Sequence, residues 1–163
     1  MVALENVSAS GPESSVASFV FTDGTASSAP RDVLAFELAE WRFGLAATAV
    51  HRIERPRPPT RVPRGPVWLE GVTVVLGEIV PVVNLHAALG ITCSRPPDDR
   101  ARLILVEHEA EIVGALVDAV IGLITVTPAT QTGDNGLVWR KGLRCLDQAG
   151  AEIIVLDFAD ALW

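Results

Sequence analysis

Short apolar runs recur along the chain, and the densest apolar stretch is residues 71–89, which read GVTVVLGEIVPVVNLHAAL. Two β-branched runs, Val72–Val75 and Ile79–Val83, flank a Leu-Gly-Glu triplet, and a Leu/Ala stretch follows. This pattern predicts a strand, a tight turn, a second strand and a short helix. Gly77 suits the turn because a residue without Cβ adopts positive φ at little steric cost. Pro81 cannot donate to a sheet ladder, which predicts that its strand lies at an edge or beside a bulge.

Other apolar runs predict three more hairpins, which pair Val33–Leu38 with Trp41–Leu45, Arg102–Glu107 with Glu111–Leu116, and Leu143–Leu146 with Glu152–Leu156. Ala46–Ile53 places Ala49, Val50 and Ile53 on one helical face and predicts a two-turn helix. Gly122 interrupts the apolar run 117–126 and predicts a bend or a bulge. Asp157–Leu162 reads as a closing short helix.

These elements fall into one domain with an internal repeat. Residues 1–30 are rich in Ser, Ala and Gly and read as a flexible tail, whereas residues 31–163 form a single domain. Within it, two halves, roughly 31–90 and 101–163, repeat the order hairpin, apolar connector, hairpin, two-turn helix. Such a repeat predicts two similar small barrels packed together.

Residues 52–64 (RIERPRPPTRVPR) differ from their surroundings in charge and in proline content. Five Arg against one Glu give this stretch a net charge of +4. Because the whole chain has a net charge of −7, the rest of the chain carries −11. Its four prolines exclude a central strand and favour an extended edge or a polyproline II segment. Two interpretations stay open: a solvated edge protected from aggregation, or a docking edge for an acidic partner.

Composition narrows the functional classes. The 163 residues are 49% apolar, and the net charge of −7 disfavours binding to nucleic acid or to anionic membranes. No apolar run is long enough to span a membrane, and residues 1–30 lack the pattern of a signal peptide. Cys93 and Cys145 show no metal-type spacing, which predicts reduced thiols in a cytoplasmic protein.

No catalytic motif is present. The sequence contains no GxSxG, HExxH, phosphate-loop or GxGxxG pattern. The His-Glu-Ala-Glu run at 108–111 falls on a predicted hairpin tip, where charged side chains are ordinarily solvated, and His51 and His86 are solitary. Asp118 and Asp157 each end an apolar run, a common place for a capping carboxylate. The sequence therefore predicts no enzyme activity, no metal site and no cofactor.

The apolar excess carries more information than the polar residues. Thr73 is the one polar residue from Val72 to Leu76, and Leu76 is an unusual residue for the tip of a turn. Either both faces of this strand are buried within the domain, or one face contacts another protein.

The central stretch also carries a family motif, P-x-W-x-x-G-V-x-x-x-x-G-x-x-x-P-V-x-x-L, whose fixed positions are Pro66, Trp68, Gly71, Val72, Gly77, Pro81, Val82 and Leu85. In this motif the chain resembles the CheW family of chemotaxis coupling proteins, from about Val33 onward. The resemblance implies a mainly β fold of two five-stranded SH3-like barrels with short helices. It also implies a non-catalytic adaptor that joins the cytoplasmic tips of methyl-accepting chemoreceptors to the barrel domain of a CheA-like histidine kinase.

The chain departs from the family where the resemblance places partner contacts. Val74, Val75 and Leu76 stand where the family usually has Asn, Leu and Arg; Arg52 replaces an acid, and Asn84 replaces an Asp. The residues expected to bind partners are Val50, Arg52, Val74, Leu76, Gly77, Glu78 and Asn84. Two alternatives remain: an adaptor that binds only the receptor or the kinase and so limits the array, and a β-barrel that binds a small molecule.

Overall fold

The computed structural model describes residues 29–92, 98–108, 110–129 and 142–158. The expectations for the tail up to residue 28, for Cys93 and for the closing helix beyond residue 158 lie outside these ranges. The described elements, in chain order, are β1 (Arg31–Leu38), β2 (Trp41–Ala46), a 3₁₀ turn (Ala47–Ala49), β3 (Val50–Glu54), β4 (Leu69–Val75), β5 (Glu78–Asn84), α1 (Leu85–Leu89), β6 (Arg102–His108), β7 (Glu111–Val117), β8 (Ala119–Pro128), β9 (Gly142–Asp147) and β10 (Glu152–Leu156).

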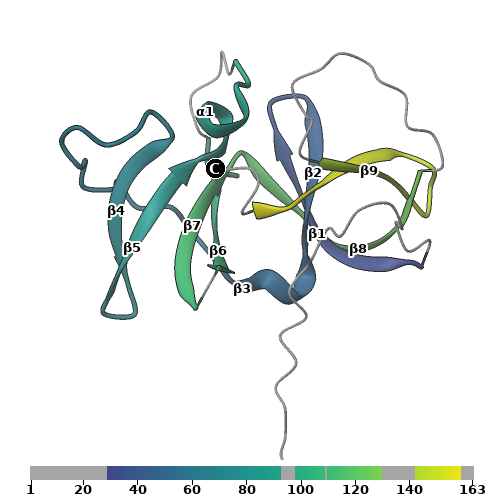
Figure 1. Ribbon diagram of the computed structural model, residues 1–163, viewed down its shortest axis with the longest axis horizontal. Coiled ribbons are helices and arrows are strands. Elements are labelled where there is room, and N and C mark those ends of the chain that lie inside the picture. The colour runs from purple at the N-terminus through teal and green to yellow at the C-terminus, as the bar shows by residue number, and fades with distance from the viewer. Residues whose placement is uncertain (1–28, 93–97, 109, 130–141, 159–163) are drawn as a thin grey trace, which may run out of the picture.

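The strands form two five-stranded units that lie side by side (Figure 1). One is a closed barrel with the strand order β1-β2-β10-β9-β8, and the other is a sheet with the order β3-β6-β7-β5-β4. Each unit contains one parallel pair, β10 with β2 in the barrel and β5 with β7 in the sheet. Both pairs join strands far apart in the sequence. The expected mainly β fold of two five-stranded units is confirmed.

The two units share a hydrophobic core, which explains why several strands contain consecutive apolar residues without alternation. In β1, Val33 and Ala35 point into the closed barrel, whereas Leu34 and Phe36 pack toward the sheet. The rings of Phe36 and Phe43 stack in this shared layer with centroids 6.0 Å apart. The shared core draws on both units and includes Leu34, Phe36, Leu38, Phe43, Ile154, Val83, Leu85, Ile104 and Val106. A strand that is buried on both faces has apolar side chains on both faces, so apolar and polar residues do not alternate along it.

All four predicted hairpins are present. The 71–89 stretch forms β4, β5 and α1, and the other three form β1–β2, β6–β7 and β9–β10. The predicted irregularity at Gly122 is also confirmed, because the β1–β8 register shifts beside the Ala35–Gly122 pair. Pro81 lies in an interior strand rather than at an edge, next to the register shift between Leu69 and Gly71 in β4. The alternative of a nearby bulge is therefore the correct one.

Two expectations differ from the structure. Residues 46–53 do not form a two-turn helix: a single 3₁₀ turn leads into β3, which pairs with β6 from Val50↔Val106 onward. The hydrogen bonds offered by β6 outweigh the weak helical period of this short segment. The halves 31–90 and 101–163 do not coincide with the two units, because each unit takes strands from both halves.

Candidate partner-binding surface

The β4–β5 turn holds a leucine in a backbone conformation that leucine rarely adopts. Leu76 has φ 52° and Gly77 has φ 88°, so both central residues of this two-residue turn are left-handed, as a type I′ turn requires. Gly accepts this conformation readily, whereas a side chain with a Cβ is strained there. The Leu76 side chain is 75% exposed, so packing within the chain does little to offset the strain.

An apolar pair extends the exposed surface from the turn into the strands. Val74 and Ile79 face each other across the hairpin and are 57% and 74% exposed. Their neighbours Val75 and Val80 point to the opposite face and are buried in the sheet. Val74, Leu76 and Ile79 are named the hairpin patch below. The alternative in which both faces of this strand are buried within the domain is wrong, because one face of the hairpin is exposed and apolar. The alternative of a protein contact stays a prediction.

The structure brings only some of the predicted partner-binding residues together. Val74, Leu76, Gly77 and Glu78 lie at the tip of the β4–β5 hairpin. Val50 and Arg52 lie on β3, at the opposite end of the strand order from β4, and not on the β4–β5 hairpin.

The two β3 residues also differ from each other in their surroundings. Val50 packs against the shared core. Arg52 is exposed, and its Nε lies 2.9 Å from Glu54 Oε1, so its charge is partly met within the same strand.

Asn84 has a local structural task. Its side-chain oxygen accepts a hydrogen bond from the backbone N–H of Ala87 at 3.2 Å, which caps the start of α1. Its Nδ2 donates to Glu70 Oε2 at 3.2 Å, and its backbone N–H donates to the carbonyl of Trp68. Asn and Asp are equally good N-caps, so the replacement of the family's Asp by Asn84 keeps this role.

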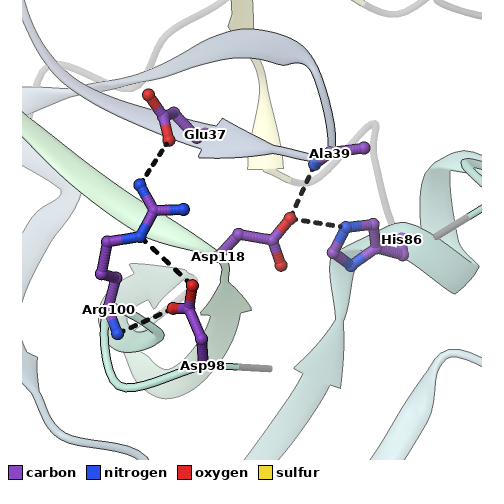
Figure 2. A network of polar contacts seen from close by, with 6 residues as sticks. All are labelled: Glu37, Ala39, His86, Asp98, Arg100 and Asp118. Carbon is purple, nitrogen blue, oxygen red and sulfur yellow. Dashed lines mark hydrogen bonds and ion pairs between the residues drawn. The ribbon is translucent and has the colours of Figure 1, made fainter. Parts of the chain in front are cut away.

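A second group of polar residues links the two units through contacts that the sequence analysis did not find (Figure 2). Asp118 follows β7 and precedes β8. Its Oδ2 accepts a hydrogen bond from the backbone N–H of Ala39 at 2.6 Å and lies 3.1 Å from His86 Nε2. The expected capping role of Asp118 is therefore present, and its target is the β1–β2 turn. These partners are 79 and 32 residues away in the sequence, a separation that no local motif reveals.

Arg100 adds a further link on the same side. It lies between Glu37 Oε2, at 3.5 Å, and Asp98 Oδ2, at 3.2 Å (Figure 2). The backbone N–H of Asp118 also donates to the carbonyl of Glu37 at 3.1 Å. The end of β1 is thereby tied to the connection between the two units.

Family comparison gives the deciding observation. The family model described as the CheW-like domain matches residues 32–158. The chain belongs to the CheW family. This membership supports the expectation that the chain is not an enzyme, because CheW proteins are non-catalytic.

Several CheW proteins are similar to the chain in sequence or structure. The chemotaxis protein CheW of Thermotoga maritima is 32% identical over 131 residues, covering 77% of this chain and 83% of that protein. The probable chemotaxis protein CheW of Rhizobium etli is 33% identical over 99 residues, and the match covers 60% of this chain and 62% of the relative. The crystal structure of the scaffolding protein TtCheW from Thermoanaerobacter tengcongensis superposes with a TM-score of 0.69 at 26% identity, covering 80% of this chain and 90% of that one.

Over the described ranges, no group of three or more His, Cys, Asp or Glu side chains is placed to hold a metal ion. Nor does any helix in that part of the chain have the length and apolar character needed to cross a bilayer. The candidate partner-binding surface is the hairpin patch, whose three apolar side chains are exposed.

Proposed function

We propose that this CheW-family chain is a cytoplasmic, non-catalytic adaptor of a chemosensory system. It binds the barrel domain of a CheA-like histidine kinase and the cytoplasmic tip of a methyl-accepting chemoreceptor, and it uses the hairpin patch for one of these contacts. The carrying observation is the exposed Leu76 in a strained turn, flanked by exposed Val74 and Ile79. A strained residue without internal packing supports a role in contacts outside the chain.

The chemistry of this contact differs from the polar one that the family resemblance implies. An arginine at the turn would recognise a carboxylate through paired hydrogen bonds, whereas Leu76 offers apolar area alone. Arg52 lies on β3 and already pairs with Glu54, so it is not the charge that replaces an arginine at the turn. We therefore expect the cognate partner to present an apolar pocket to the hairpin patch.

Size-exclusion chromatography with light scattering tests the proposal. The full chain is mixed separately with the barrel domain of its cognate kinase and with a fragment of the receptor tip. Complex formation with both supports the adaptor, and complex formation with one alone makes it a specialised adaptor that engages a single side of the array. Absence of both complexes, together with a thermal shift caused by a metabolite, would overturn the proposal in favour of the small-molecule barrel.

A variant locates the contact. Leu76→Arg restores the residue common in the family, and we expect it to weaken the cognate complex by about tenfold or more, because the charge has no counterpart in an apolar pocket. Val67→Arg is the matched control. Val67, like Leu76, is an exposed apolar side chain, but it lies in the loop before β4 and not at the hairpin tip. If the two variants weakened the cognate complex equally, the hairpin patch would not be the binding surface.

A further inference from the structure

Four arginines in one short stretch have no partner in the described chain. Arg55, Arg57, Arg61 and Arg64 are all exposed, and within the ranges that the structure describes none of them makes a hydrogen bond or an ion pair. The other arginines in those ranges each have a partner: Arg31, Arg42, Arg52, Arg100, Arg102 and Arg144. Unsatisfied guanidinium groups are thus concentrated in residues 55–64, here called the Arg/Pro strip.

The strip is held in place against β4. The backbone of Thr60 exchanges two hydrogen bonds with Val72, at 2.8 and 2.9 Å. Gly71 permits this close approach, because a Cβ there would lie 2.4 Å from the carbonyl oxygen of Thr60. Four prolines, Pro56, Pro58, Pro59 and Pro63, restrict the backbone on both sides of this anchor. The arginines are therefore carried by a backbone with little conformational freedom to lose on binding.

Exposed apolar side chains lie on the β4–β5 hairpin, whose strand β4 pairs with the strip. Among the residues that the structure describes, ten large hydrophobic side chains are exposed, and six of them lie between Ile53 and Ile79 in the sequence. The pairing of Thr60 with Val72 is antiparallel, so the chain before Thr60 runs toward the Val74 end of β4. The basic strip and the apolar Val74 consequently lie at the same edge of the sheet unit, along β4.

The charges define which partner fits. The stretch 52–64 carries +4 against −11 for the rest of the chain, so an extended polyanion such as a nucleic acid or a membrane would meet repulsion beyond the strip. Two nearby acids are engaged internally, Glu54 with Arg52 and Glu70 with Asn84. Arginine binds carboxylates in a bidentate geometry, and short acidic segments can fit the strip without reaching the negative surface.

We propose that the Arg/Pro strip is a docking site for an acidic protein segment that also carries apolar side chains. Its carboxylates pair with Arg57 and Arg61, and its apolar side chains cover Val74 and Ile79 on the adjoining hairpin. The proposal rests on the adaptor function only for the identity of the natural partner. The binding chemistry itself is independent of that identity and can be measured with a synthetic segment.

The probe is a fluorescein-labelled peptide in which Glu residues are interspersed with Leu, and its binding to the full chain is followed by fluorescence anisotropy. We expect saturable binding that weakens with salt. The double substitution Arg57→Glu/Arg61→Glu should weaken binding by about tenfold or more, and Arg57→Lys/Arg61→Lys should cause a smaller loss because charge is kept while bidentate geometry is lost. A peptide with Lys in place of Glu should not bind.

The matched control reverses the charge of two arginines of the closed barrel, the exposed Arg42 and the half-buried Arg144, in the double variant Arg42→Glu/Arg144→Glu. This variant should leave peptide binding unchanged. Thermal unfolding confirms that each variant is folded. Three results would overturn the proposal: no binding of the peptide, an equal loss in the strip and control variants, or tighter strip-dependent binding of heparin or phosphatidylserine vesicles than of the peptide. Peptide binding without any kinase or receptor complex would instead count against the adaptor function alone.

Discussion

Leu76 combines a strained backbone with an exposed side chain, and the two properties can be separated by substitution. Asn adopts the left-handed conformation more readily, and Asn-Gly is the favoured pair for a type I′ turn. We expect Leu76→Asn to raise the free energy of unfolding by about 0.5–1 kcal/mol. The same change should weaken partner binding, because it removes the apolar side chain. Urea denaturation measures the first effect and titration with the kinase domain the second.

A control distinguishes turn strain from the general loss of exposed apolar surface. Val67 is 90% exposed and does not have positive φ. Val67→Asn should change neither stability nor binding appreciably. If Leu76→Asn left stability unaltered as well, the left-handed conformation would carry no measurable strain.

The buried thiol of Cys145 should make stability depend on alkaline pH. Burial raises the pKa of Cys145, and nearby Arg31 partly opposes this rise. The unfolded chain therefore loses its thiol proton at a lower pH than the folded chain does. This stabilising contribution is complete below the ordinary thiol pKa and is lost as pH rises through the folded value.

The measurement is the free energy of unfolding between neutral pH and about pH 10, just above the ordinary thiol range. Stability should fall over this interval in the parent chain, and the fall should be smaller in Cys145→Ala. The offset in stability that Cys145→Ala causes at neutral pH reflects lost packing and does not enter the comparison. Parallel pH profiles for the two proteins would exclude the thiol as the cause.

At the scale of elements, the Arg/Pro strip packs against β4 at a position that only glycine fits. Gly71 has φ 152°, and a Cβ would lie 2.4 Å from Thr60 oxygen. We expect Gly71→Ala to lower the free energy of unfolding by about 2 kcal/mol or more, because both the conformation and the contact become unfavourable. Amide hydrogen exchange at Thr60 and Val72 should accelerate as the strip separates from the strand.

Gly150 provides a matched control for this substitution. It also has a positive φ, 79°, but a Cβ there would meet nothing within 4 Å. Gly150→Ala should therefore cost about 1 kcal/mol from backbone strain alone. A loss as large as that of Gly71→Ala would show that the contact with Thr60 contributes little.

Elements with their own turn signals could be predicted from the sequence, and elements defined by a distant partner could not. The β4–β5 hairpin is local: two β-branched runs flank Gly77, and the pairing Val74↔Ile79 follows directly. That alternation also places Ile79 beside Val74, so the exposed Ile79 could have been included in the site. β3 forms by pairing with β6, some fifty residues later in the chain. Local periodicity contains no trace of this pairing and therefore predicts a helix for the same residues.

At the scale of the whole molecule, Asp118 connects the closed barrel with the sheet unit. Asp118→Ala removes the acceptor for the Ala39 amide and the partner of His86. We expect a loss of about 1–2 kcal/mol in the free energy of unfolding, as for other hydrogen bonds to a charged acceptor. Exchange of the Ala39 amide should accelerate in the variant.

Asp32 serves as the control because its Oδ1 accepts from Thr125 Oγ1 at 2.7 Å within the barrel alone. Asp32→Ala should have a smaller effect on stability and none on Ala39 exchange. If both variants lost stability equally while Ala39 kept its protection, Asp118 would not be a link between the two units.

The arrangement of the two units was the least accessible part of the fold. The repeated order of elements indicated two barrels, yet the exchange of strands between the halves depends on the parallel pairs β10–β2 and β5–β7. No turn specifies such pairs, and only the packed core selects them. The same limit applies to Asp118 and His86, which are brought together by the packing of the units and not by sequence spacing.

The interleaved strands have a consequence for synthesis. β3 to β7 all lie between Val50 and Val117, so the sheet unit has every strand once residue 117 has left the ribosome. The closed barrel cannot form until β10 has been synthesised, because β10 pairs with β2. Until then the β1–β2 hairpin can pair only with β8, and the core that Phe36 and Phe43 enter is incomplete. The nascent chain therefore folds from its middle outward, and its earliest strands are the ones that depend longest on protection from aggregation.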